Sequence, residues 1–136
     1  MSQIIENLYI GDKEFARDIS ELCENTIIIN CADEIKDQKY HLKIPLCDGT
    51  NNAEFTVIMI NEIADVIHWY LSNNIEIVVH CMCGISRSTA VIVYYLMKYC
   101  CCNFDEAYDF VKTRRQFVNI NIWFIYLLRQ IKFITK

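Results

Sequence analysis

Short apolar runs alternate along this 136-residue chain with longer segments in which apolar residues recur at helical spacing. A short continuous run rich in Ile, Val and Leu is typical of a strand that is buried on both faces of a sheet. Such runs predict strands at residues 8–10, 26–31, 42–46 and 75–79. The chain is therefore expected to build a sheet that lies inside the protein.

The longest amphipathic pattern lies in the middle of the chain. Asn51 or Asn52 can cap a helix that continues to about residue 71, with apolar side chains at every third or fourth position. Asn103 and Glu106 have the spacing of a capping box, which predicts a helix from there to about residue 114. Further helices are predicted at residues 13–22, with Asp12 as a candidate cap, at 88–100 and at 121–133.

Strands mixed with helices predict an α/β fold, in which helices cover both faces of a central, mostly parallel sheet. Ligands of such sheets bind beyond the carboxyl ends of the strands, where Cys81 follows the strand predicted at residues 75–79. The hydrophobic content of 54% is sufficient for one good core. Because the chain has one Pro, three Gly and no repeat or linker-like stretch, residues 1–136 are interpreted as a single domain.

The segment that joins this strand to the helix at residues 88–100 carries the most chemical information. Its sequence is His-Cys-Met-Cys-Gly-Ile-Ser-Arg-Ser, with Cys81 six residues before Arg87. A loop that enters a helix N-terminus directs backbone N–H groups at one point, and the helix dipole favours negative charge there. Arg87 adds a planar guanidinium that fits two phosphate oxygens, and the same field favours ionisation of the Cys81 thiol. The pattern indicates hydrolysis of phosphate esters through a phosphocysteine.

The same residues carry a resemblance to a known family. His-Cys-x-x-Gly-x-Ser-Arg-Ser resembles the signature loop of the cysteine-dependent protein tyrosine phosphatases, in the form used by dual-specificity phosphatases. Similarity to this family also covers residues 7–11, 44–48, 90–97, 106–107 and 115–124. The resemblance implies the protein tyrosine phosphatase-like fold and a small, atypical, catalytic-domain-only dual-specificity phosphatase over residues 1–136.

Within the loop, the resemblance implies that Cys81 is the nucleophile and that Arg87 stabilises the charge of the transition state. Ser88 can hydrogen-bond the thiolate and make it a better leaving group, it can cap the helix, or it can do both. A buried structural thiol and a surface arginine at the helix end are the non-catalytic alternatives for Cys81 and Arg87. Gly84 is expected to supply a positive φ or a close approach to the ligand. The expected phosphate-binding residues are Met82, Cys83, Gly84, Ile85, Ser86 and Arg87.

The leaving group of such a reaction needs a proton, which a carboxylic acid on a separate loop usually supplies. Asp48 follows the strand predicted at residues 42–46 and begins a turn-rich segment that can close over the pocket. The family resemblance makes it the candidate general acid, and an ordinary turn aspartate is the alternative. Asp33, Glu34 and Asp37 are expected to be solvated surface charges.

Three further residues are expected to support the loop. His80 is predicted to fix it from behind by hydrogen bonds, or else to be a core histidine. The resemblance places Arg115 near the pocket, where it can meet a second phosphate or an acidic substrate residue; a solvated arginine at a helix end is the alternative. Asn121 matches an asparagine that braces the loop in this family. The chain departs from the pattern there, because Ile120 replaces a Pro and Leu127 a Gln, so Asn119 is a second candidate brace.

The variable residues of the loop narrow the expected substrate. Met82, Cys83, Ile85 and Ser86 include no basic side chain of the kind that related phosphoinositide phosphatases use for extra phosphates. The chain also lacks the Asn-Arg-Tyr-like segment that deepens the pocket of tyrosine-specific relatives. Phosphotyrosine, phosphoserine and phosphothreonine on proteins are therefore the expected substrates. The alternatives are a phosphoinositide, an RNA 5′-phosphate, or a non-catalytic phospho-binding module.

The composition of the chain limits its expected partners and its expected location in the cell. A net charge of −4 and a pI near 5.3 argue against nucleic acid, and the sequence has no signal peptide or long apolar run for a membrane. The eight cysteines are interpreted as reduced thiols, which predicts a cytoplasmic location that can extend to the nucleus. No metal or other cofactor is expected, and the oligomeric state is open. Cys31, Cys47 or Cys83 can act as a redox partner of Cys81, with core packing as the alternative for Cys31 and Cys47.

Overall fold

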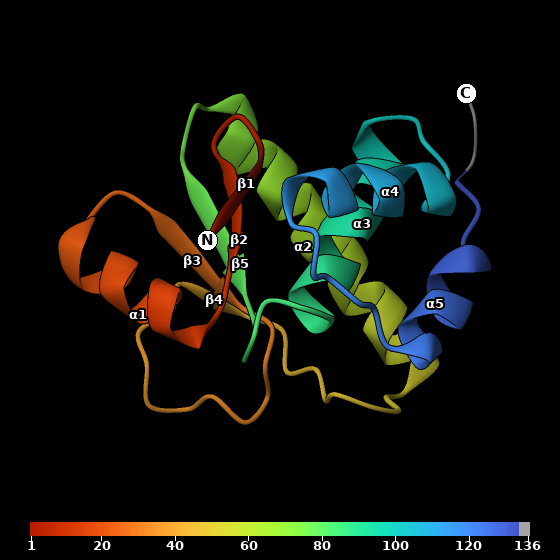
Figure 1. The fold of residues 1–136 in the computed structure, drawn as a ribbon, viewed down its shortest axis with the longest axis horizontal. Helices are drawn as coiled ribbons and strands as arrows, with labels where there is room; N and C mark the ends of the chain where they lie inside the picture. Colours follow the sequence, from red (N-terminus) through yellow and green to blue (C-terminus); the bar gives the residue numbers. More distant parts are fainter. Residues whose placement is uncertain (134–136) are drawn as a thin grey trace.

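The computed structural model describes residues 1–133. Its centre is a five-stranded sheet (Figure 1). The order of its strands in space is β1-β2-β5-β3-β4; the last four run parallel, and β1 is antiparallel to β2. The α/β fold with a mostly parallel sheet, predicted from the sequence, is thereby confirmed. The strands are β1 (Ser2–Ile5), β2 (Leu8–Gly11), β3 (Ile27–Asn30), β4 (Leu42–Lys43) and β5 (Ile77–His80).

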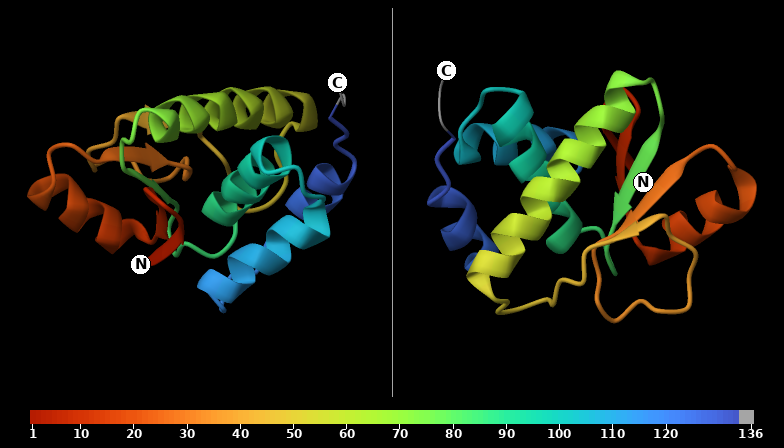
Figure 2. Two further views of the ribbon diagram at one scale, coloured as in Figure 1. Left: turned by 90° about the horizontal axis from the view of Figure 1, so that it is seen from above. Right: turned by 180° about the vertical axis from the view of Figure 1, so that it is seen from behind.

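Helices cover both faces of this sheet. In the described residues these are α1 (Lys13–Leu22), α2 (Ala53–Ser72), α3 (Arg87–Tyr99), α4 (Phe104–Arg114) and α5 (Ile122–Arg129). Seen from above, α1 and α2 lie on opposite sides of the sheet, and α3 lies between α2 and α4 (Figure 2). No helix between residues 1 and 133 has the length and apolar character of a membrane span.

The packing of α3 fixes the position of the loop that precedes it. All four residues of β5 are buried, and so is every residue of α3 from Arg87 to Met97. A strand and a helix that are both enclosed in the core cannot shift relative to each other without opening well-packed contacts. The loop of residues 81–86 between them is therefore held at both ends.

Side-chain hydrogen bonds cap the N-termini of three helices at the positions that the sequence predicts. The Asn52 side chain accepts a hydrogen bond from the N–H of Phe55, the third residue of α2, and Asp12 accepts one from the N–H of Phe15, the third residue of α1. Asn103 and Glu106 form both bonds of the capping box at the start of α4, at 2.9 and 3.0 Å. Each such bond satisfies a backbone N–H that has no partner inside its own helix. Of the two candidate caps for α2, Asn52 is the one used.

Most predicted elements differ from the observed ones by one or two residues at an end, and three show larger differences. Strand β1 was not predicted; it turns back into β2 through Asn7, whose φ of 65° is a conformation that Asn tolerates. Strand β4 ends at Lys43 rather than at residue 46, because Pro45 has no N–H to continue the ladder. Helix α5 ends at Arg129 rather than at residue 133, and the N–H groups of the next two residues bond three residues back, which tightens the last turn.

Candidate active site

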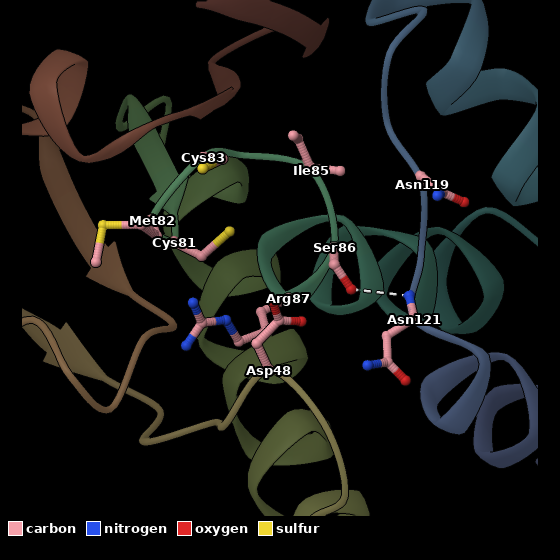
Figure 3. Close-up of a pocket in the computed structure, with 9 residues that line it drawn as sticks. All are labelled: Asp48, Cys81, Met82, Cys83, Ile85, Ser86, Arg87, Asn119 and Asn121. Carbon is pink, nitrogen blue, oxygen red and sulfur yellow. Dashed lines mark hydrogen bonds between the residues drawn. The ribbon is translucent and has the colours of Figure 1, made fainter.

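The loop of residues 81–86 curves tightly around a cavity of about 290 Å³ (Figure 3). Gly84 has a φ of +67°, and a Cβ at this position would lie 2.6 Å from the carbonyl oxygen of Gly11. Other segments tie the loop from outside: the N–H of Lys13 donates to the carbonyl of Met82, and that of Asn119 to the carbonyl of Ile85, both at 3.0 Å. With these carbonyls turned outward, the loop can present N–H groups to the cavity.

Cys81 lies at the start of this loop, where its side chain borders the cavity although the residue is 3% exposed. Its Sγ is 3.2 Å from Oγ of Ser88. Burial raises the pKa of the Cys81 thiol, but the Ser88 hydroxyl and the backbone N–H groups of Ser88, Gly84 and Ile85 outweigh burial and lower the pKa below the usual value for cysteine. The lowered pKa makes it easier to form the thiolate, which is the nucleophilic form.

Ser88 is the second residue of α3, and Ser86 occupies the cap position. The cap assigned to Ser88 as an alternative is therefore wrong, and its hydroxyl is placed for the thiolate instead. The Ser86 side chain makes no cap bond; its Oγ accepts a 2.8 Å hydrogen bond from the backbone N–H of Asn121 (Figure 3). Ser88 thus contacts the sulfur of Cys81, and Ser86 connects the loop to the segment that precedes α5.

Arg87 forms a bidentate ion pair with Glu34, with Nη1–Oε1 and Nη2–Oε2 distances of 2.5 and 2.7 Å. The guanidinium side chain is 4% exposed, whereas that of Glu34 is 47% exposed. The hydrogen bonds from Arg87 lower the pKa of Glu34 to about 2, so the carboxylate is ionised at neutral pH. The prediction that Glu34 is a surface charge agrees with its exposure, but the sequence analysis missed its ion pair with Arg87. Its place just after β3, at the carboxyl edge of the sheet that also carries Cys81, was the available signal.

Asp48 lies across the cavity from the loop, on the connection between β4 and α2 (Figure 3). Hydrogen bonds on both sides of Asp48 hold this connection. The carbonyl of Leu46 accepts a 3.0 Å hydrogen bond from Nη1 of Arg87, and the Asn51 side chain bonds both the N–H and the carbonyl of Cys47 at 2.9 and 3.0 Å. Asp48 itself is exposed. A carboxyl group is thereby placed on the same cavity as the thiol and the guanidinium.

A family model described as "Dual specificity phosphatase, catalytic domain" matches residues 8–133, which include the whole of this site. The chain belongs to the dual specificity phosphatases. It is 30% identical to human dual specificity protein phosphatase 21 over 126 residues, which cover 88% of this chain and 65% of that protein. It is 32% identical to human dual specificity protein phosphatase 9 over 133 residues, which cover 90% of this chain and 34% of that protein.

The fold agrees with this family as well. The crystal structure of human DUSP28 superimposes with a TM-score of 0.82, covering 96% of this chain and 94% of that one at 18% identity. The protein tyrosine phosphatase-like fold expected from the sequence is thereby confirmed. The chain spans about two thirds of phosphatase 21 and about one third of phosphatase 9, so the relatives contain segments that it does not match.

In this dual specificity phosphatase Arg115 neither lines the cavity nor lies exposed at the helix end, which were the two alternatives that the sequence suggested. It is 5% exposed and lies behind the loop, where Nε donates to the carbonyl of Gly84 at 2.9 Å and Nη2 to that of Cys83 at 3.3 Å. Nη1 donates to Oγ of Ser2 at 3.0 Å, and the guanidinium lies 4.3 Å from the ring centre of Phe117. It does not line the cavity, so the expectations of a contact to a second phosphate and of a solvated helix end are both wrong. Arg115 instead holds the outer carbonyls of the phosphatase loop.

His80 and Asn121 also contact the loop. His80 is fully buried, and its Nδ1 lies 3.2 Å from the carbonyl oxygen of Cys81, to which it donates when protonated. Burial lowers the pKa of His80 and favours the neutral imidazole. Asn121 reaches Ser86 with its backbone N–H, while its side chain accepts from the N–H of Trp123 and begins α5. Asn119 likewise reaches the loop with its backbone N–H. Both asparagines line the cavity, and both contact the loop through the main chain.

The cysteines proposed as redox partners differ in their surroundings. Cys31 is buried beside the β5 end, where its N–H donates to the carbonyl of His80, and burial followed by the charge of Cys81 raises its pKa well above the usual value. Cys47 and Cys83 are exposed. A redox role for any of them stays a prediction. Within residues 1–133, no three His, Cys, Asp or Glu side chains converge in a way that could hold a metal ion.

Proposed function

We propose that this chain hydrolyses phosphotyrosine, phosphoserine and phosphothreonine on proteins through a phosphocysteine formed at Cys81. The observation that carries the proposal is the convergence of three groups on one cavity: a thiol with a lowered pKa, a buried guanidinium and a carboxyl group. The membership in the dual specificity phosphatases supports it.

In the first step the Cys81 thiolate attacks phosphorus and the ester P–O bond breaks. Asp48, as the carboxylic acid, gives its proton to the leaving oxygen. Arg87 and the N–H groups of the loop hold the phosphoryl oxygens, whose charge they stabilise better than water does. Glu34 keeps the guanidinium in position for this task. The products of the step are the dephosphorylated side chain and phosphocysteine.

In the second step a water molecule attacks the phosphocysteine and the S–P bond breaks. Asp48, now a carboxylate, accepts a proton from the water, and inorganic phosphate leaves. The Ser88 hydroxyl donates to the departing thiolate, from which it lies 3.2 Å away. The enzyme returns to its initial state, with no change in oxidation state.

The lining of the cavity supports a substrate with a single phosphoryl group. Asp48 and Arg87 are the charged residues among those that line it, and Arg87 is already paired with Glu34. A phosphoinositide with several phosphates, or an RNA 5′ end, would place additional anionic groups against a protein whose net charge is −4. Protein phosphoesters fit this site better.

Hydrolysis of p-nitrophenyl phosphate tests the nucleophile. We expect turnover that is insensitive to EDTA, inhibited by vanadate and abolished in Cys81→Ser, while Cys23→Ser, a control thiol outside the cavity, keeps full activity. Undiminished turnover in Cys81→Ser would exclude Cys81 as the nucleophile. Binding of phosphopeptides without any turnover in the unmodified chain would favour the non-catalytic module instead.

Two comparisons test the acid and the substrate class. Asp48→Asn is expected to lower kcat about 100-fold or more for phenyl phosphate, a poor leaving group, and much less for p-nitrophenyl phosphate. Equal losses on both would exclude Asp48 as the acid. A panel of phosphopeptides, a phosphoinositide and a 5′-phosphorylated RNA, assayed for released phosphate, is expected to show the highest kcat/KM on the phosphopeptides.

A further inference from the structure

Two helices begin at the edge of the catalytic cavity. Asp48 lines the cavity, and α2 begins five residues later at Ala53. Asn121 also lines it and is the cap residue of α5 (Figure 3). The first turns of α2 lie beside α5 in every view (Figures 1 and 2). A polypeptide with its phosphorylated side chain in the cavity can therefore continue over these two helix ends.

The surface of these two helix ends is unusually apolar. Of the ten large apolar side chains that are exposed in the described residues, four belong to them: Phe55 and Ile58 on α2, and Ile122 and Tyr126 on α5, each 55–67% exposed. The members of each pair are three or four positions apart, so they share one face of their helix. Clustered exposed apolar side chains on a protein surface are typical of a contact site.

A groove of about 430 Å³ lies between the two helices. It is lined by Ala53, Glu54, Val57, Ile58 and Leu127. Its lining is almost entirely aliphatic, and Glu54 is the one charged residue in it. The shape and composition suit a large apolar side chain better than a charged or phosphorylated one.

We propose that this groove, which we call the α2–α5 groove, binds a large aliphatic or aromatic side chain of the phosphoprotein substrate. The inference rests on the proposed function. Leu127 lies six residues beyond Asn121, which corresponds to about 9 Å along a helix. An extended peptide advances about 3.3 Å per residue, so the apolar residue is expected about three positions from the phosphorylated one. The groove would thereby select substrates by an apolar anchor rather than by charge.

Matched phosphotyrosine peptides test this inference. One set carries Leu three or four residues before or after phosphotyrosine, and the other carries Ser at the same positions. We expect the best Leu peptide to have a kcat/KM about tenfold above its Ser partner, as the burial of one apolar side chain predicts. Ile58→Asp should remove this advantage and leave the kcat/KM for p-nitrophenyl phosphate unchanged, which also shows that the variant is folded.

Trp69→Asp is the matched control. Trp69 is 59% exposed on the same helix, about 16 Å farther along it, and does not line the groove. The control should keep the full preference for Leu peptides. Equal rates on Leu and Ser peptides at every position, or an advantage that persists in Ile58→Asp, would overturn the inference. So would a dimer in sedimentation that Ile58→Asp dissociates, because a second copy of the chain would then occupy the groove.

Binding to the Cys81→Ser variant separates this inference from the proposed function. If the unmodified chain turns over no peptide but Cys81→Ser binds Leu peptides about tenfold more tightly than Ser peptides, the proposed function fails and the groove stands. If all peptides are hydrolysed without a preference, and Cys81→Ser binds them equally, the groove fails and the proposed function stands.

Discussion

Arg87 combines a buried position with two fixed contacts, to Glu34 and to the carbonyl of Leu46. A guanidinium offers five N–H groups, so these contacts leave others to bind phosphate. Lysine at this position could supply the charge but not the planar, forked geometry. We therefore expect Glu34 to be a positioning residue, which acts on the substrate through Arg87.

We expect Glu34→Gln to lower the kcat/KM for p-nitrophenyl phosphate about tenfold, because the variant loses the negative charge that pairs with Arg87. The effect is moderate because the Glu34 side chain is half exposed, and solvent weakens exposed ion pairs. Vanadate inhibition should weaken in parallel, since vanadate uses the same guanidinium. Since the pKa of Glu34 is about 2, the loss should not vary with pH above about 4. Asp37→Asn, an exposed acid on the same loop, is the control and should behave as the unmodified chain. An identical loss in both variants would contradict the positioning role.

The pKa of Cys81 offers a second test at the level of single residues. The Ser88 hydroxyl is among the groups that lower it, so Ser88→Ala should shift the pKa of Cys81 upward. Iodoacetamide reacts with the thiolate, and its rate of modification of Cys81 should then rise at a higher pH than in the unmodified chain. Mass spectrometry identifies the modified residue, and Thr113→Ala, on the exposed face of α4, serves as the control. Superimposable pH profiles would show that Ser88 does not act on the sulfur.

At the level of elements, the turn from β5 into α3 depends on Gly84. Its φ of +67° is unfavourable for any residue with a Cβ, and that atom would lie 2.6 Å from the Gly11 carbonyl oxygen and 2.7 Å from Nη2 of Arg115. Backbone atoms cannot move away as a flexible side chain can. The loop conformation thus requires glycine at position 84 for two reasons: the φ is positive, and the strand that contains Gly11 leaves no room for a Cβ.

Gly84→Ala is therefore expected to lower the free energy of unfolding by about 2 kcal/mol and to reduce phosphatase activity together with it. Gly49→Ala is the matched control, because a Cβ at Gly49 would have nothing within 4 Å and its φ is not in the positive region. That variant should unfold with unchanged or slightly higher free energy. Chemical denaturation of both variants gives the comparison, and equal stabilities would argue against the strain at Gly84.

The elements with strong periodicity and clear caps were predictable from the sequence, and those that depend on distant contacts were not. Helix α4 was predicted from Asn103 and Glu106, and the buried β5 from its apolar run. Strand β1 mixes polar and apolar residues and exists through its pairing with β2, which no local pattern records. The ion pair between Glu34 and Arg87 joins residues 53 positions apart, and no local sequence pattern records such a contact.

At the level of the whole molecule, the site is assembled from segments that are far apart in the sequence. Arg115, at the end of α4, bonds Ser2 in β1 and the carbonyls of Cys83 and Gly84 in the loop. These contacts span 113 positions on one side and about 31 on the other. The first strand, the fourth helix and the catalytic loop therefore share one buried guanidinium. Loosening this connection should affect both the stability of the fold and the shape of the loop.

Arg115→Lys tests this connection, because it keeps the charge and removes the forked geometry. A single ammonium cannot reach Ser2, Cys83 and Gly84 as the three guanidinium nitrogens do, and we expect a loss of about 2 kcal/mol in the free energy of unfolding. Since the loop proposed to bind phosphate loses its outer support, kcat/KM should fall by a similar factor for p-nitrophenyl phosphate and for phosphopeptides. Arg114→Lys is the matched control, since Arg114 is exposed on the same turn. A loss confined to doubly phosphorylated peptides would instead mean that Arg115 contacts substrate, against its buried position behind the loop.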